Sequence, residues 1–327
     1  MIHFTNGSIV AASLVAAGVP GRVVECDDPL HEGPCVAGLS AARWRETRAR
    51  FLARNGDLAF DAILADLAER DAAIAEAAGA DEIVLWFEHD LFDQLNLLWL
   101  LEALAAARAP RGRVRTIVVG EHAEVPRFHG LGQLTPPQLL ALFPRREPLT
   151  GEAAAEAHAA WADVCAPDPR GLARRAASPS THWVWLPGAL RRLVEELPDV
   201  VSGLSRTERQ GLEGIAAGAR TLGEAFQSCA AREERVFLGD WSFFGTMRGL
   251  ARAPAPLVRL GDGSGDDPSA AASAPVALTG VGRRVLAGEA DHVAINGIDR
   301  WVGGVHLAGA SSRWRWDSAG HRLTPSA

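Results

Sequence analysis

Short apolar runs alternate with longer helical patterns through residues 1–150, and this alternation constrains the fold more than any other feature. The runs at 2–4, 22–26, 82–87 and 114–119 have the length and composition of buried strands. The helical patterns between and after them span 8–17, 40–54, 58–78 and 91–107. Strands that alternate with helices in this way form a mainly parallel sheet covered on both faces. The sequence therefore predicts a doubly wound α/β fold for a ligand-binding domain over residues 1–150.

A helical segment is expected next, over residues 151–203. Helical patterns at 150–165 and 183–196 flank a break at the Ala-Pro-Asp-Pro stretch 166–169, because proline does not continue a helix. The second pattern tolerates Pro187 only in its first turn. We expect this segment to extend the first domain or to link it to the next one.

The last part of the chain, residues 204–327, has the element order of a winged-helix-like module. The expected elements are helices that start at capping boxes 205–208 and 221–224, a third helix after Asp240, strands at 256–260 and 276–278, and a terminal hairpin turning at Gly303-Gly304. Three helices followed by two strands predict a three-helix unit with a two-stranded wing.

Charge and hydropathy narrow the classes of function. The net charge of -7 provides no long-range attraction to nucleic acid or to an anionic membrane. The third helix of the C-terminal module offers only Arg248 and Arg252 as cations, whereas a recognition helix brings several basic or amide side chains to the groove. No apolar run reaches the roughly 18 residues of a membrane span, and the N-terminus lacks the basic segment of a signal peptide. We expect a cytoplasmic protein with no membrane partner, and DNA is a disfavoured partner.

Polar and ionisable side chains follow every predicted strand at its carboxyl end. Because parallel strands end at one edge of a sheet, and open α/β sheets bind ligands there, we expect these side chains to converge. The candidate site residues are Asn6, Gly7 and Ser8 after the first strand, Asp27 and His31 after the second, Glu88, His89, Asp90 and Gln94 after the third, and Glu121 and His129 after the fourth. This convergence is the strongest indication of function in the sequence.

The turn before the first predicted helix suits an anion. Backbone amides at a helix N-terminus attract negative charge, Gly7 allows close approach, and the side chains of Asn6 and Ser8 add donors. These residues equally suit a plain N-cap with no ligand. The turn therefore predicts either a phosphate or carboxylate site or a structural cap.

Three residues are candidates for catalysis. Glu88 or His89 would transfer a proton, and Asp27 would bind a hydroxyl or an amine of the ligand. Gln94 would orient the ligand. His129 lies in a glycine-rich loop that could close over the site.

The same region contains residue types that bind metals. Glu88 and Asp90 would lie on one side of an extended strand and His89 on the other. No HExxH or comparable spacing is present, so whether a metal or any cofactor is bound is left open. Asp90 or Asp93 would also suit the N-cap of the following helix, which needs no ligand.

These segments resemble a bacterial family, the domain of unknown function numbered eighteen thirty-five. The resemblance rests on HFTNGSIVAASL at 3–14, DDPLHEGP at 27–34, VLWFEHDLFDQLNLLWLL at 84–101 and GLGQLTPPQLLALF at 130–143. It covers the N-terminal domain and its helical extension. It implies that Gly7, Asp27, Glu88 and Gln94 belong to a recurrent set, although many relatives carry an acid where this chain has Ser8. The resemblance implies no particular reaction.

Two classes of function remain. The first is a protein that binds a phosphorylated or nucleotide-like small molecule at the strand ends, as a transferase or a hydrolase if it is an enzyme. The second is a regulatory or interaction protein, in which the α/β domain senses a ligand and the winged-helix-like module contacts DNA or another protein. The sequence does not indicate the oligomeric state.

Overall fold

The computed structural model describes residues 1–55, 59–263 and 268–325. Its largest sheet has five strands in the order β2-β1-β3-β4-β5. The strands are β1 (Ile2–Thr5), β2 (Arg22–Glu25), β3 (Ile83–Glu88), β4 (Val114–Val119) and β5 (Glu147–Pro148). The first four are parallel to their neighbours, and β5 is antiparallel to β4. The prediction of a mainly parallel α/β sheet is therefore confirmed, whereas the antiparallel edge strand β5 was not anticipated.

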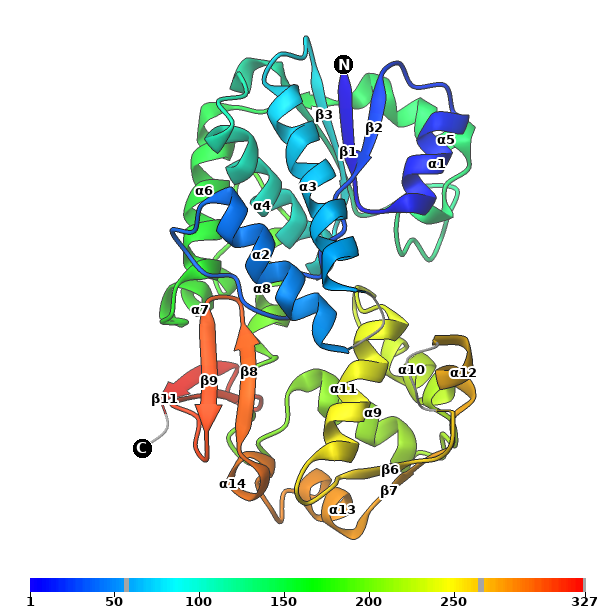
Figure 1. Ribbon diagram of the computed structural model, residues 1–327, viewed down its shortest axis with the longest axis vertical. Coiled ribbons are helices and arrows are strands. Elements are labelled where there is room, and N and C mark those ends of the chain that lie inside the picture. Colours follow the sequence, from blue (N-terminus) through cyan, green and yellow to red (C-terminus); the bar gives the residue numbers. More distant parts are fainter. Residues whose placement is uncertain (56–58, 264–267, 326–327) are drawn as a thin grey trace.

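Helices cover both faces of this sheet (Figure 1). One face packs against α1 (Ser8–Ala16) and α5 (Pro136–Leu142), and its core includes Trp86. The opposite face packs against α3 (Phe60–Ala77) and α4 (Leu91–Ala106). Every residue of β3 is buried, as expected for a central strand with helices on both sides.

A fully buried ion pair holds the loop that follows β2. Helix α2 (Ala41–Leu52), which is continued by the 3-10 turn η1 (Ala53–Asn55), contributes Arg48. The guanidinium Nη2 lies 2.6 Å from Asp28 Oδ1, and both side chains have 0% exposure. Arg48 also donates to the carbonyls of Pro29 and Glu32. A single side chain therefore fixes the path of the loop from Asp28 to Glu32.

The middle of the chain packs on the sheet domain through α4. Its helices are α6 (Gly151–Cys165), α7 (Arg170–Ala176) and α8 (Leu186–Val194). The expected position of Pro187 in the first turn of α8 is confirmed. One continuous apolar core runs from the sheet through α4, α6 and α8 into the C-terminal helices.

The C-terminal part begins with three helices and a two-stranded hairpin, and smaller elements follow it (Figure 1). The first elements are α9 (Arg206–Ala216), α10 (Leu222–Ala230), α11 (Asp240–Arg252), β6 (Val258–Leu260), α12 (Pro268–Ser273) and β7 (Val276–Leu278). The rest are α13 (Gly280–Leu286), α14 (His292–Asn296), β8 (Ile298–Val302), β9 (Val305–Gly309), β10 (Trp314–Asp317) and β11 (Arg322–Pro325). Short 3-10 turns complete the chain: η2 (Arg111–Arg113), η3 (Leu131–Gln133) and η4 (Phe143–Arg145). The hairpin of β8 and β9 turns at Gly303-Gly304 as expected, whereas β10 and β11 were not anticipated.

The two predicted capping boxes differ in the structure. At α9, Ser205 and Glu208 satisfy each other's backbone amides, and the full box is present. At α10, the Thr221 side chain accepts from the Glu224 amide, but the Glu224 carboxylate accepts from the amide of Arg220. The second box is therefore replaced by a cap that reaches one residue farther back.

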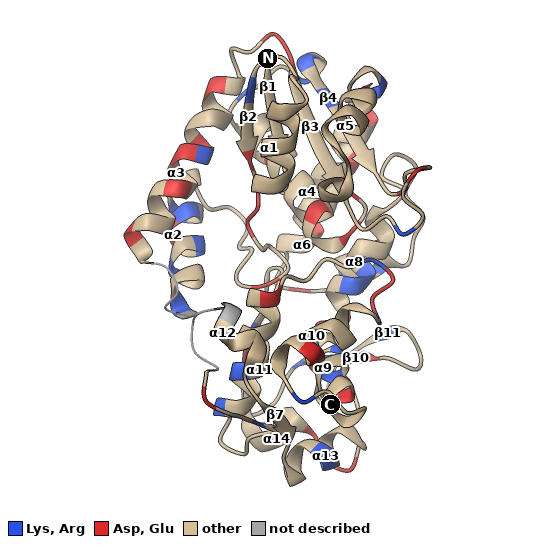
Figure 2. Cartoon of the chain, turned by 90° about the vertical axis from the view of Figure 1, so that its right-hand side faces the viewer, with Lys and Arg blue, Asp and Glu red and all other residues tan. Residues whose placement is uncertain are grey.

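Charged residues of both signs lie along the outer helices α2 and α3 (Figure 2).

No helix in the described part of the chain combines the length and the apolar character needed to cross a membrane.

The Arg48–Asp28 pair generates a stability prediction. Arg48→Met removes the cation but keeps much of the apolar stem, and it leaves a buried carboxylate without its main partner. We expect the free energy of unfolding to fall by about 3–5 kcal/mol in urea denaturation. The matched control is Arg50→Met on the same helix, where an exposed pair with Glu46 is lost; that change costs about 0.5 kcal/mol or less. Equal losses in the two variants would contradict the assigned role of Arg48.

Candidate functional site

The candidate site lies where the chain leaves the sheet in opposite directions from β1 and β3. The two strands are adjacent and parallel, with Thr5 opposite Trp86. From β1 the chain crosses to β2 through α1, on one face, and from β3 it crosses to β4 through α4, on the other. Such a switch point is where open α/β sheets form ligand crevices. Asn6 stands directly after β1 at this point.

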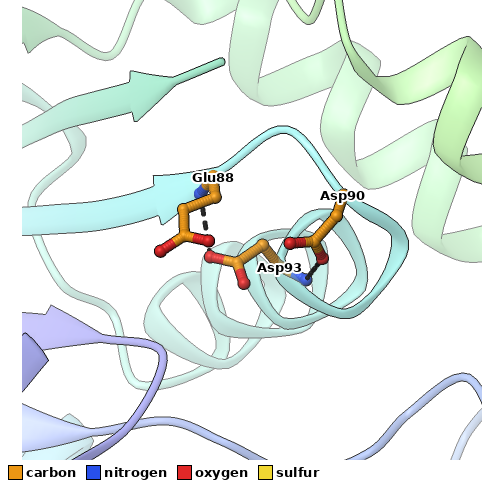
Figure 3. Close-up of side chains that lie close together, drawn as sticks. All are labelled: Glu88, Asp90 and Asp93. Atoms are coloured by element: carbon orange, nitrogen blue, oxygen red, sulfur yellow. Dashed lines mark hydrogen bonds between the residues drawn. The ribbon is translucent and has the colours of Figure 1, made fainter. Parts of the chain in front are cut away.

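Three carboxyl groups lie together at the end of β3 (Figure 3). They belong to Glu88, Asp90 and Asp93, and one oxygen from each lies within 4.8 Å of the others. All three residues are buried, with 5%, 4% and 2% exposure. The local sequence explains the grouping, because β3 ends at Glu88 and α4 begins after Asp90. The Asp90 carboxylate accepts the Asp93 amide at 3.0 Å, which confirms Asp90 as the N-cap of α4.

Asn6 connects β1 to this cluster. Its amide nitrogen Nδ2 lies 2.9 Å from Glu88 Oε1 and 2.9 Å from Asp93 Oδ2. The Glu88 backbone amide donates to Asp93 Oδ1 at 2.8 Å, and the Leu131 amide donates to Glu88 Oε1. The cluster therefore joins the end of β1, β3, α4 and the start of η3 through hydrogen bonds.

Burial and mutual repulsion keep protons on these carboxyl groups. Burial raises the pKa of Glu88 to about 7, although the bonds from Asn6 and Leu131 act in the opposite direction. Burial and then the charge of Glu88 raise the pKa of Asp90 to about 8. The pKa of Asp93 is also raised well above its usual value, first by burial and then by the two neighbouring carboxylates. The three groups therefore share protons at neutral pH instead of carrying three negative charges.

Carboxylate oxygens at this spacing are ligands that Mg²⁺ or Ca²⁺ prefers. However, Asn6 directs the hydrogens of one amide at both Glu88 and Asp93. A cation would face these hydrogens, so the arrangement fits shared protons better than a bound ion. We therefore call Glu88, Asp90 and Asp93 the proton-sharing cluster.

A close backbone approach covers the Glu88 carboxylate. Gly130 lies directly against it, and a methyl group at this position would overlap the carboxylate atoms. Gly130 has an extended backbone, so the requirement for glycine here comes from space and not from conformation. This packing explains how the loop after β4 reaches the end of β3.

A cavity of about 1240 Å³ opens beyond the ends of β3 and β4. Its lining includes the predicted residues His89, Glu121 and His129, and also His122, Phe128, Trp185, Arg127, Arg145 and Arg235. Trp185 reaches β4 because Gly120 has no side chain, and a methyl group there would overlap the indole. The lining includes neither Glu88 nor Asp90.

His89 is the buried polar group of this cavity. It is 6% exposed, and its Nδ1 atom is buried with no hydrogen-bond partner. Its ring contacts Phe128 and, edge to face, Trp185. Burial, and then the charges of Arg235 and His129, lower its pKa to about 4. His89 is therefore neutral at pH 7 and can offer a donor or an acceptor to a ligand.

The structure separates other predicted site residues from this cavity. Gly7 is the N-cap of α1 without a side-chain cap, and Ser8 is exposed. Asp27 is exposed and forms no salt bridge with a described residue, whereas its neighbour Asp28 is the one paired with Arg48. Neither Gly7 nor Asp27 lines the cavity.

Two more predicted residues have other surroundings than expected. The Gln94 side-chain amide donates to the backbone carbonyl of Glu88 at 2.6 Å, so it connects α4 to β3 instead of facing a ligand. His31 is buried between the rings of Phe92 and Phe237, at a different cavity described below.

Sequence reasoning missed several residues of the site. Asp93 was treated only as a possible cap, although its spacing from Asp90 places both on the first turn of α4. Arg127 and Phe128 belong to the same loop as His129, at 127–133, but were not named as candidates. Trp185 and Arg235 come from distant segments, and no local pattern indicates that they approach the sheet.

A comparison of the chain with models of protein families and with curated proteins finds no match. The resemblance to family eighteen thirty-five therefore stays a prediction, and the site is argued from its geometry.

The raised pKa of Glu88 predicts a pH dependence. The folded carboxyl holds its proton up to about pH 7, whereas the unfolded one releases it near 4.5. Between these values the unfolded state binds fewer protons, so wild-type stability falls as the pH rises. Glu88→Gln keeps an acceptor for Asn6 but has no proton to lose. We expect its stability relative to wild type to increase between pH 4.5 and 7, by up to about 3 kcal/mol in urea denaturation. A difference that does not change with pH would contradict shared protons.

The close packing at Gly130 predicts a different response from that of a nearby glycine. Gly130→Ala pushes the loop away from Glu88 and should lower the free energy of unfolding by about 1–3 kcal/mol. Gly132→Ala is the control, because a methyl group there would lie 3.6 Å from Ile9, an ordinary contact. Thermal unfolding of the two variants measures the difference. A loss in both variants, or in neither, would show that the packing against Glu88 is unimportant.

Proposed function

We propose that the cavity at the ends of β3 and β4 binds a phosphorylated, nucleotide-like small molecule. The observation that carries this proposal is the set of three arginines that line the same cavity as the partly unsatisfied His89. Arg127, Arg145 and Arg235 all line the cavity, and none has a salt-bridge partner among the described residues. Guanidinium groups without carboxylate partners are suited to bind phosphate oxygens through paired hydrogen bonds.

The rest of the lining matches the other parts of such a ligand. Trp185 and Phe128 offer ring faces for stacking, and the Arg235 guanidinium lies 4.8 Å from the Trp185 ring centroid. Glu121, Glu124 and Glu234 also line the cavity. These carboxylates balance the charge of the three arginines and disfavour a simple polyanion. They suit a ligand that carries hydroxyl groups beside its phosphate, because carboxylates accept hydroxyl hydrogens.

The proposal changes the roles expected from the sequence. The arginines bind the anion in place of the turn Asn6-Gly7-Ser8, because Gly7 and Ser8 do not line the cavity. In this proposal His89 contacts the ligand directly. Glu88 does not line the cavity, so it affects the ligand only indirectly, through the proton-sharing cluster and through the loop at Gly130 that lies against its carboxylate. The neutral imidazole of His89 gains the hydrogen-bond partner that its buried Nδ1 atom lacks.

The alternative, a regulator that contacts DNA through a winged-helix-like module, has less support. Helix α11 would be the recognition helix of such a module, but Arg248 on it is buried. Ser242 on the same helix donates to Glu32 of the α/β domain at 2.6 Å. The face of α11 is therefore turned toward the rest of the chain. We propose that this C-terminal module serves as an intramolecular partner of the α/β domain.

Titration calorimetry with ATP, AMP, adenosine and ribose 5-phosphate tests the binding proposal. At least one phosphorylated compound should bind, and adenosine should bind more weakly or not at all. Arg235→Gln removes one charged contact and should weaken binding by about tenfold to a hundredfold. Trp185→Leu should weaken the binding of ATP and AMP more than the binding of ribose 5-phosphate, because only the nucleotides carry a base that can stack on the indole.

Arg232→Gln provides the control for these variants. Arg232 lies near Arg235 in sequence but pairs with Glu213 and does not line the cavity. Its substitution should leave binding unchanged. The proposal is wrong if no phosphorylated compound binds, or if Arg235→Gln binds them as wild type does.

A further inference from the structure

A second cavity lies between the α/β domain and the C-terminal module. It has a volume of about 340 Å³ and is lined by the loop after β2, the end of α2 with η1, helix α11, and the segment from α14 into β8. This volume is near the lower end of the roughly 300–1,000 Å³ typical of small-molecule sites. Gly249 of α11 faces open space there, because a methyl group at this position would meet no atom within 4 Å.

His31 is buried at this cavity without hydrogen bonds. It is 7% exposed, and both ring nitrogens are buried and have no hydrogen-bond partner among the residues that the structure describes. The ring is held edge to face against Phe237, with centroids 5.2 Å apart, and it also contacts Phe92. Burial lowers its pKa to about 4, so the ring is neutral and offers one donor and one acceptor. Leaving both unsatisfied costs free energy, and a ligand that donates to the acceptor nitrogen would recover part of it.

Most acidic groups of the cavity already have partners. Glu196 lies 2.5 Å from Arg192, Glu208 pairs with Arg300, and Asp299 lies 2.9 Å from the His306 ring. The two arginines neutralise the charges of Glu196 and Glu208 locally, and Asp299 is occupied by its contact with the His306 ring.

One carboxylate and one guanidinium of the cavity differ from the rest. Glu32 and Arg54 both line it, and neither has a salt-bridge partner among the described residues. Glu32 accepts one hydrogen bond, from Ser242 Oγ at 2.6 Å. Arg54 is exposed and lies over the ring of Phe51, with its guanidinium carbon 4.5 Å from the centroid. The two opposite charges therefore share a cavity without pairing with each other.

We propose that this cavity binds a zwitterion of amino-acid size. Its ammonium group donates to Glu32 and His31, and its carboxylate accepts from Arg54. The ligand thus pairs with a carboxyl group and a guanidinium that form no salt bridge with a described residue, and it donates to the acceptor nitrogen of the imidazole. It also connects the β2 loop to α11, so binding stabilises the contact between the two parts of the chain. This site is separate from the cavity at the ends of β3 and β4 and does not depend on a ligand there.

A thermal-shift screen of the full chain with the common amino acids tests the proposal. At least one amino acid should raise the melting temperature, since a ligand that binds only the folded state stabilises it. The best one is then compared by calorimetry with two analogues, the amine that lacks its carboxylate and the acid that lacks its ammonium group. Each analogue should bind about tenfold more weakly or worse.

Variants locate the site. Arg54→Gln is expected to bind the amino acid about tenfold more weakly and no longer to prefer it over the amine. Glu32→Gln should no longer bind the amino acid more tightly than the acid analogue that lacks the ammonium group. Arg50→Gln, on an exposed guanidinium paired with Glu46, and Arg235→Gln, in the other cavity, should bind as wild type does.

The proposal is overturned if no amino acid shifts the melting temperature, or if Arg54→Gln retains full affinity and preference. Arg54 is exposed, so this variant is expected to fold even if Glu32→Gln does not. Arg235→Gln changes only the cavity at the ends of β3 and β4. Failure of either proposal is therefore distinguishable from failure of the other.

Discussion

The hydrogen bonds from the Asn6 amide to Glu88 and Asp93 connect the parts of the N-terminal domain on which the site depends. They join the end of β1 to the end of β3 and to the first turn of α4, at the point where the crossovers diverge. The bonds need an acceptor on each carboxyl group, and burial with shared protons limits the repulsion between the acids. The loop at Gly130 closes on the same Glu88 carboxylate. The cluster therefore holds together the strand ends and the loop that border the cavity, although the clustered acids do not line the cavity.

Ionisable side chains occur in three arrangements in this chain. Asp28 is paired with Arg48, and this pairing fixes the loop after β2. The cluster at the end of β3 retains protons, because burial and the repulsion between neighbouring carboxylates disfavour three negative charges. In the two cavities, by contrast, four arginines and Glu32 form no salt bridge with a described residue, and two neutral histidines have buried nitrogens without a hydrogen-bond partner in the described part of the chain. Only the groups of this third arrangement are available to bind a ligand, and both binding proposals are based on them.

The packing of the C-terminal module bears directly on function. A three-helix unit with a two-stranded hairpin would ordinarily suggest contact with DNA through its third helix. Here Ser242 on α11 bonds to Glu32, and the same helix lines the cavity between the two parts of the chain. Helix α11 therefore takes part in an internal contact, and under the proposals above a ligand in that cavity would strengthen this contact.

The sequence by itself determined the mainly parallel sheet and the course of β3 into α4, and it limited the cap of α4 to Asp90 or Asp93, because these depend on local periodicity and on neighbouring residues. It also indicated that acids and histidines would gather at the strand ends. Only the tertiary structure decided which of them do so: it joined Asn6 to Glu88 and Asp93, buried His31 elsewhere, and left Asp27 exposed. It also brought Trp185 and Arg235 to the cavity. These outcomes depend on packing between segments far apart in the chain, and on burial that sets each group's charge, which no local pattern encodes.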